Sequence, residues 1–258
     1  MRRFAQAWLV VCYIFLGFAP AASSAPLIEV DDRLEVNWST LRLRFFGQAA
    51  VGSGAEGFKQ AEKDAWHDGM AYATEAVRSL NMTLVAATVT GVDESSEDAA
   101  KSLKQIASST HSYNTTYVAD GTVRVHLESA LPKALSVSGL HFRQREAAEL
   151  VPAQYTGVVL HANASTKPRA LYSIVDEHGD VVFDVRDMAQ ESYKKNLMGR
   201  WFRHPTGDEL EGAVGKNPLA IAVVPKDGRF VVKRQEWDEA IHGHKSLLIN
   251  GTIAVALP

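Results

Sequence analysis

A stripe of small side chains runs along one long amphipathic segment of this chain and limits the folds that the chain can adopt. Residues 55–80 place apolar side chains on one face at helical spacing and polar ones on the opposite face. Ser53 and Glu56 match a capping box, which predicts that a helix begins near Ala55. Small residues recur every four positions on the apolar face, so this helix is expected to approach a sheet or another helix closely. They are Ala61, Ala65, Gly69 and Ala73.

Strand patterns accompany this helix. Leu41, Leu43 and Phe45 alternate with arginines, the period-2 pattern of a half-buried strand. Residues 82–92 are apolar and β-branched and predict another strand, and residues 95–106 predict a shorter helix.

A hairpin signal follows. Asp120-Gly121 separates two alternating runs, residues 113–117 and 123–127, and predicts a tight turn because glycine tolerates positive φ. The order strand, helix, strand, helix and hairpin predicts an α+β domain over residues 29–140.

The second half is expected to be a separate α+β domain over residues 154–258, after a linker at residues 141–153 in which Pro152 stops a helix-prone run. The whole chain is therefore predicted to be α+β, with two small domains, each a mainly antiparallel sheet packed with one or two helices. Strands are expected at residues 155–161, 171–176, 181–185, 219–224, 230–232 and 247–257, helices at 187–197 and 235–241, and a turn-rich stretch at 200–215.

Residues 1–24 have the pattern of a signal peptide. Two arginines precede an apolar run, and Ala19-Pro20-Ala21 supplies small residues for cleavage. The run is about 15 residues long, short of the roughly 20 that cross a bilayer, so cleavage is favoured over an uncleaved anchor. The mature protein is expected in the periplasm or on the periplasmic side of the outer membrane, with no transmembrane span left.

Cys12 is the only cysteine, and it lies inside this apolar run. Lipid attachment would require a small residue before it, and Val11 stands there instead. An exported chain without further cysteines must be stabilised by its core and not by disulfides. The formal net charge of −3 argues against nucleic acid as a partner.

The candidates for chemistry are few. His242 and His244, close to Asp238 and Glu239, are the best metal-ligand candidates, although a helix ending at Gly243 would spread the two rings apart. A nucleophile-elbow Gly-x-Ser-x-Gly is absent from the sequence, so no catalytic residue and no cofactor are expected.

A second candidate site is a basic and aromatic segment. It could bind another protein, since arginine and large aromatic side chains dominate interface hot spots. The alternative is a loop packed onto the core. The segment consists of Arg200, Trp201, Phe202 and Arg203.

Two motifs carry a family resemblance over about residues 38–131. They are Ala61-Glu62-Lys63-Asp64-Ala65-Trp66 followed by Asp68-Gly69, and Asp120-Gly121-Thr122-Val123-Arg124-Val125. In this order they resemble the bacterial surface-lipoprotein family that includes flagellar outer-membrane protein P, and the amino-terminal domain of flagellar assembly protein T. The resemblance implies an envelope or flagellar-ring component. The chain departs from the lipoproteins in lacking a usable lipid-attachment cysteine.

The second half is similar to a carboxy-terminal region of exported bacterial proteins. The matching pieces are residues 155–159, 167–171, 175–179, 215–219 and the final strand. Where those relatives usually carry Asp-Ala-Arg-Gly, this chain has His161-Ala162-Asn163-Ala164, so a site built on those charges is not expected here.

The sequence therefore predicts a non-catalytic, exported envelope protein that acts through protein-protein contacts, as an envelope or flagellar assembly or scaffold component. Its expected partners are other envelope proteins, and self-association is left open. The alternative is a periplasmic module that binds a small ligand or a metal.

Overall fold

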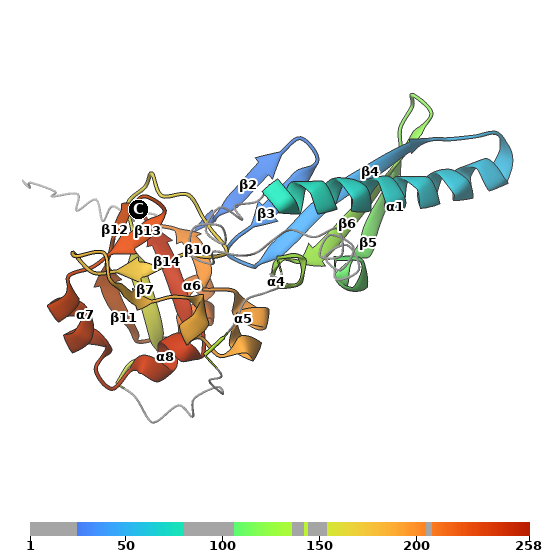
Figure 1. Cartoon of the computed structure of the whole chain (residues 1–258). Coiled ribbons are helices and arrows are strands. Elements are labelled where there is room, and N and C mark those ends of the chain that lie inside the picture. The colour runs from blue at the N-terminus through green and yellow to red at the C-terminus, as the bar shows by residue number, and fades with distance from the viewer. Residues whose placement is uncertain (1–24, 80–105, 136–141, 144–153, 205–207) are drawn as a thin grey trace, which may run out of the picture.

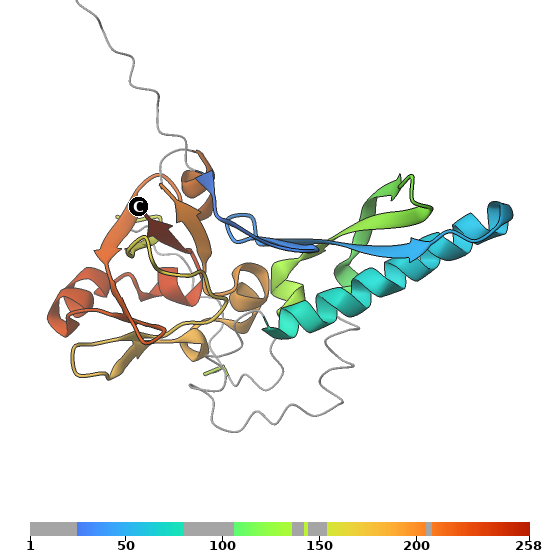
Figure 2. The same ribbon diagram turned by 90° about the horizontal axis from the view of Figure 1, so that it is seen from above.

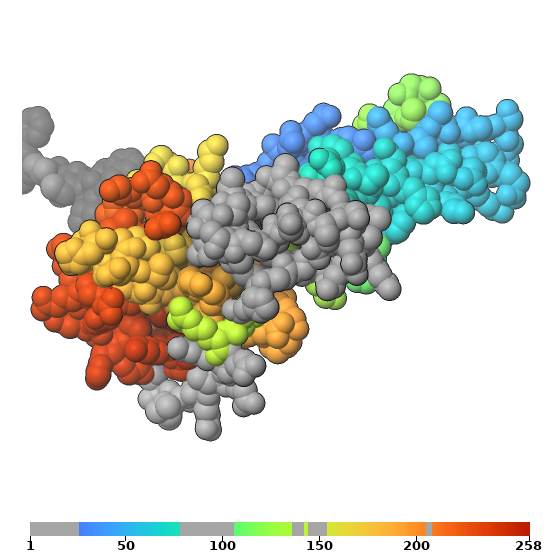
Figure 3. Space-filling model, in the orientation of Figure 1, coloured from blue at the N-terminus to red at the C-terminus, as the bar shows by residue number. Residues whose placement is uncertain are grey.

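The computed structural model describes residues 25–79, 106–135, 142–143, 154–204 and 208–258. The predicted signal peptide, the strand at 82–92, nearly all of the helix at 95–106 and most of the linker at 141–153 lie outside these residues. The space-filling view shows two lobes: one formed by the blue, cyan and green segments, the other by the yellow to red ones (Figure 3). The predicted α+β class is confirmed.

The first lobe contains a five-stranded sheet in the order β2-β3-β4-β6-β5, and every pairing in it is antiparallel. The predicted hairpin is confirmed: Gly121, with φ of +81°, lies in the turn between its two strands. The strands are β2 (Ile28–Asp31), β3 (Leu34–Asn37), β4 (Arg42–Ala50), β5 (His111–Tyr117) and β6 (Thr122–Ala130).

The predicted long helix is α1 (Gly54–Ser79), and it runs along one face of this sheet, over β4 and β6 (Figures 1 and 2). Its small residues make a very close approach to β4 possible. A β-carbon on Gly47 would overlap the carbonyl oxygen of Ala65 and the backbone of Gly69. Ala61, Ala65, Gly69 and Ala73 are all buried, as the stripe predicts.

The main sheet of the second lobe differs from the expectation. Its order is β1-β10-β14-β7-β11, and only β1 is antiparallel to its neighbour. A parallel sheet needs long crossover connections, and here helices and a second sheet lie between the successive strands. The strands are β1 (Ala25–Pro26), β7 (Gly157–His161), β10 (Arg200–Arg203), β11 (Pro218–Ala222) and β14 (Ile253–Leu257).

The last strand differs from the half-buried strand that its alternating pattern predicts. All five residues of β14 are buried, because both faces of the sheet are covered. Ile253, Val255 and Leu257 belong to the main core, whereas Ala254 and Ala256 pack in a separate cluster with Val214 of α6 (Asp208–Val214). Residues 247–249, expected in this strand, instead belong to α8 (Lys245–Ile249).

The stretch 200–215, expected to be rich in turns, contains β10 and α6. The second lobe also has a four-stranded sheet in the order β12-β13-β8-β9. None of the helices in the described ranges is long and apolar enough to cross a bilayer. The remaining elements are β8 (Ile174–Val175), β9 (Val181–Phe183), β12 (Val224–Lys226), β13 (Arg229–Val231), the 3-10 helix η1 (Val185–Asp187), α4 (Leu131–Ala134), α5 (Gln190–Asn196) and α7 (Arg234–Ile241).

The two lobes are joined at the turn between β3 and β4. The Ser39 hydroxyl donates to the carbonyl oxygen of Trp201 at 2.6 Å and accepts from the backbone N–H of Leu27 at 2.8 Å. The Trp201 N–H donates to the carbonyl oxygen of Trp38 at 3.2 Å. Trp38, Ser39 and Trp201 are all buried, so residues from both lobes share one hydrophobic core.

The close contact between α1 and β4 predicts that adding one methyl group at Gly47 destabilises the fold. Gly47→Ala should lower the free energy of unfolding by at least about 2 kcal/mol, since the added carbon meets backbone atoms that cannot rotate away. Urea denaturation followed by tryptophan fluorescence measures this change.

Gly212→Ala is the matched control, because Gly212 lies in α6 with open space around its β-carbon position. It should be neutral or stabilise the protein by up to about 1 kcal/mol, since alanine favours the helix. Equal stabilities for the two variants would contradict the close approach.

Candidate protein interface

The first sheet has one face packed against α1 and one face turned away from it. On β4, Leu43, Phe45 and Gly47 are buried towards the helix, and the side chains between them point to the other face. The register places Phe46 of β4 directly opposite His126 of β6 on that outer face. Its side chains are half-buried or exposed.

Five side chains gather on this outer face, and we call them the aromatic–arginine cluster. The imidazole of His126 lies in the middle, with ring centroids 5.8 Å from Phe46 and 6.0 Å from Tyr113. The guanidinium carbons of two arginines lie over the rings, 5.7 Å from the Tyr113 centroid and 5.3 Å from the Phe46 centroid. The cluster consists of Arg44, Phe46, Tyr113, Arg124 and His126.

These residue types suit protein recognition. Tyrosine and arginine are enriched in interface hot spots. Tyrosine supplies a large contact area at a low cost in conformational entropy, and arginine presents several N–H donors in a rigid fork. Tyr113 is 51% exposed, so half of its surface is available for contact. The Nε atom of Arg124 is buried and has no hydrogen-bond partner within the described part of the chain.

A shallow hollow of about 190 Å³ lies beside the cluster. Its lining includes Tyr113, His126 and Arg44, together with Asp31 and Asp32 from the turn between β2 and β3. The outer face therefore offers aromatic, basic and acidic groups within one small area.

Glu128 fixes the position of one cluster arginine. It is 7% exposed, and its carboxylate accepts from Arg44 Nε at 2.8 Å and also from Arg42. Desolvation raises the pKa of this carboxyl group, but hydrogen bonds and charges from Arg44 and Arg42 outweigh it and leave the pKa below its ordinary value. Glu128 is therefore ionised at neutral pH and holds Arg44 beside Tyr113.

The strand β5 forms an exposed edge of the sheet, next to this outer face. It is the last strand of the sheet on its side, and all seven of its residues are exposed. It contains no lysine, proline or acidic residue, the usual devices that block edge-to-edge pairing. Its Tyr117 hydroxyl donates to Glu62 of α1, which ties that end of the strand to the helix.

The two aromatic residues of the predicted basic and aromatic segment are buried and not at the surface. Trp201 and Phe202 lie in β10, with exposures of 0% and 1%. Their side chains fill the two opposite faces of a covered parallel sheet and cannot contact a partner. The alternative of a segment packed onto the core is the better description, and only Arg200 and Arg203 stay half-exposed.

The two candidate metal ligands do not converge. His242 follows α7 and is exposed, Gly243 turns the chain with φ of +76°, and His244 precedes α8. The His244 ring packs edge-on against Tyr155, with centroids 5.0 Å apart. Within the described ranges, no group of three or more histidine, cysteine or acidic residues could hold a metal ion.

Two acidic groups in the second lobe have structural roles. Asp176 accepts backbone hydrogen bonds from His178 and Asp180 at 3.0 and 2.9 Å, which fixes the turn between β8 and β9.

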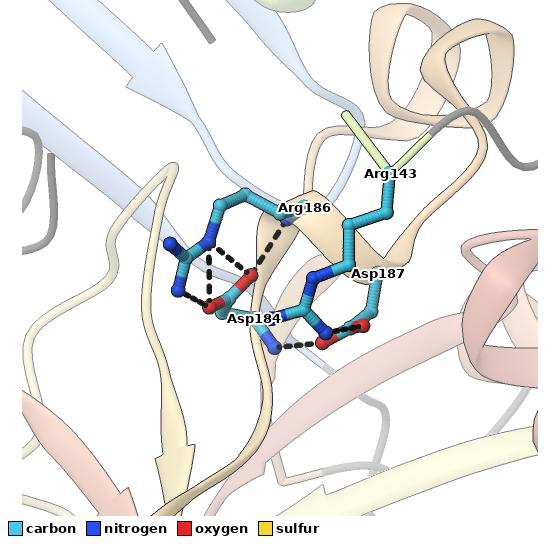
Figure 4. A network of polar contacts seen from close by, with 4 residues as sticks. All are labelled: Arg143, Asp184, Arg186 and Asp187. Carbon is cyan, nitrogen blue, oxygen red and sulfur yellow. Dashed lines mark hydrogen bonds and ion pairs between the residues drawn. The ribbon is translucent and has the colours of Figure 1, made fainter. Parts of the chain in front are cut away.

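The second group is the network in Figure 4. Asp184 caps η1 through the Arg186 N–H at 2.8 Å and also binds the Arg186 side chain. Asp187 accepts from Arg143 at 2.5 Å and from the Asp184 N–H at 3.2 Å. These carboxylates are engaged by neighbouring donors, so the network serves to stabilise this turn.

No protein-family model matches the chain, and no curated protein sequence matches it.

The sequence held a partial signal for the aromatic–arginine cluster. The alternation in β4 places Arg44 and Phe46 on one face of the strand and their buried neighbours on the other. The alternation in β6 separates His126 from its buried neighbours in the same way. The antiparallel register that brings these strands together, and the irregularity between Ser112 and Asn114 that positions Tyr113, could not be deduced from periodicity.

Glu128→Gln tests the electrostatics of this face. The variant should lose about 2 kcal/mol of stability at pH 7, since two charged hydrogen bonds are weakened. The native pKa lies below the unfolded value, so this stabilisation is complete above about pH 4.5 and disappears as the pH falls through the folded-state pKa. The stabilities of the two proteins should therefore converge at low pH. A difference that is constant from pH 7 to pH 3 would refute this role for Glu128.

Proposed function

We propose that this chain is a non-catalytic, exported protein that acts through protein-protein contacts, and that the outer face of its first sheet is the contact surface. The observation that carries the proposal is the aromatic–arginine cluster beside the exposed edge of β5. An extended segment of a partner can pair with that edge by backbone hydrogen bonds, while side-chain contacts with the cluster supply specificity.

Two further features support this function. The signal-peptide pattern of the first 24 residues favours export, and the resemblance of the first domain to envelope and flagellar-ring components favours assembly as the role. We therefore propose that the protein works in the periplasm or on the periplasmic side of the outer membrane, with another envelope protein as its partner.

Site-specific photo-crosslinking in cells that export the protein tests the proposal. A photoreactive phenylalanine analogue at position 113 replaces one aromatic ring by another and should preserve the local packing. It should give a discrete covalent adduct with a protein, since the ring would lie within the bound interface.

The matched control places the same analogue at Lys63, an exposed residue of α1, the helix on the other face of the sheet. This position should give no adduct of the same mass. Adducts of equal yield at both positions, or at neither, would refute the outer face as the contact surface.

A second test separates affinity from folding. Tyr113→Ala should reduce the yield of the complex by roughly 30-fold or more, the effect of losing a hot-spot side chain of at least 2 kcal/mol. Phe58→Ala removes another exposed aromatic ring, 45% exposed, from α1 and should leave the yield unchanged. An equal loss in both variants would point to a general effect of aromatic truncation.

A further inference from the structure

A pocket of about 300 Å³ opens in the second lobe, beyond the ends of two parallel strands. β7 and β11 pair in register up to His161 and Ala222. The segments that follow these strands, residues 163–172 and residues 225–230, form most of the pocket lining. In open parallel sheets, ligands bind in the crevice outside the carboxyl ends of the strands.

The lining is strongly basic. Asp227 is the only acidic residue of the lining, against two lysines and two arginines, so the formal excess is three positive charges. None of the basic side chains forms an ion pair with another residue in the described part of the chain. They are Lys167, Arg169, Lys226 and Arg229.

This concentration of positive charge does not follow from the composition. The chain carries a formal net charge of −3, yet four cations from two distant segments meet around one cavity. Like charges repel one another, so gathering four of them around a single carboxylate costs free energy. A bound anion would offset that cost and would also be attracted to the site by its field.

The pocket is held in shape by buried groups. Trp201 Nε1–H donates to the carbonyl oxygen of Arg169 at 3.1 Å, and the Tyr172 hydroxyl donates to that of Met198 at 2.5 Å. The rings of Tyr172, Trp201 and Phe230 pack together at centroid distances of 5.0 to 6.1 Å and form the floor.

Gly228 makes room for one of the cations. It has φ of +78°, and a β-carbon there would overlap the Arg169 guanidinium. Arg169 Nη1 instead lies 3.5 Å from the Gly228 carbonyl oxygen, which leaves its other donors available. A lining that is already ordered loses little entropy when a ligand binds.

We infer that this pocket binds a small multivalent oxyanion, a molecule that carries phosphoryl or carboxylate groups. Arginine forks bind both groups through paired N–H donors, and lysine adds compact positive charge. The volume lies at the small end of ligand pockets, which favours a metabolite-sized molecule. The site lies in the second lobe and does not depend on the proposed protein interface.

Isothermal titration calorimetry of the purified protein at low ionic strength tests this inference, with inorganic pyrophosphate and citrate as separate probes. Pyrophosphate represents the phosphoryl source and citrate the carboxylate source, and at least one should bind one molecule per chain. Lys226→Gln and Arg229→Gln should each weaken binding by roughly tenfold or more, since each removes a charged hydrogen bond. Added salt should weaken binding as well.

Lys216→Gln is the matched control: it removes a lysine that is 86% exposed and lies outside the pocket, and it should leave the affinity unchanged. Thermal melting of each variant checks that its fold is intact. The inference is overturned if neither probe binds more tightly than about 1 mM, or if well-folded Lys226→Gln and Arg229→Gln variants both bind as the parent does. Neither result would affect the crosslinking at position 113.

Discussion

The close approach of α1 to β4 is the constraint on which the first lobe depends. Gly47 and Gly69 bring helix and strand backbones into direct contact, which only residues without a β-carbon allow. This contact sets the helix over β4 and β6 (Figure 2). The helix covers one face of the sheet and leaves the other face uncovered by it, while the strand order places β5 at the edge. The aromatic–arginine cluster is therefore a consequence of where the helix packs.

The joint between the lobes links this surface to the rest of the protein. Ser39 is buried, and its hydroxyl satisfies both a donor at Leu27 and an acceptor at Trp201, so neither backbone group is left without a partner. The chain also begins its described part in the second lobe, where β1 pairs with β10, before it enters the first sheet. The short segment from Ala25 to Ser39 thus contacts both lobes and connects them.

The local elements could largely be predicted from the sequence, but their assembly could not. The capping box, the small-residue stripe and Asp120-Gly121 correctly predicted α1 and the β5–β6 hairpin, because local backbone preferences determine them. Parallel pairing in the second lobe depends on long-range contacts, so short alternating runs such as that of β14 suggested an antiparallel sheet. The two alternatives for Trp201 could not be separated for the same reason: its burial comes from neighbours far away in sequence. The basic pocket needs two such segments and has no local signal.

We propose that a partner protein covers the outer face of the first sheet in the cell. Hydroxyl-radical footprinting measures it directly, by comparing side-chain oxidation in the purified protein and in intact cells. Tyr113 should be oxidised in the purified protein and strongly protected in cells, while the exposed Phe58 of α1 should react equally in both. The buried Tyr172 provides the unreactive reference. Equal oxidation of Tyr113 in both samples, normalised to Phe58, would show that no partner covers this face.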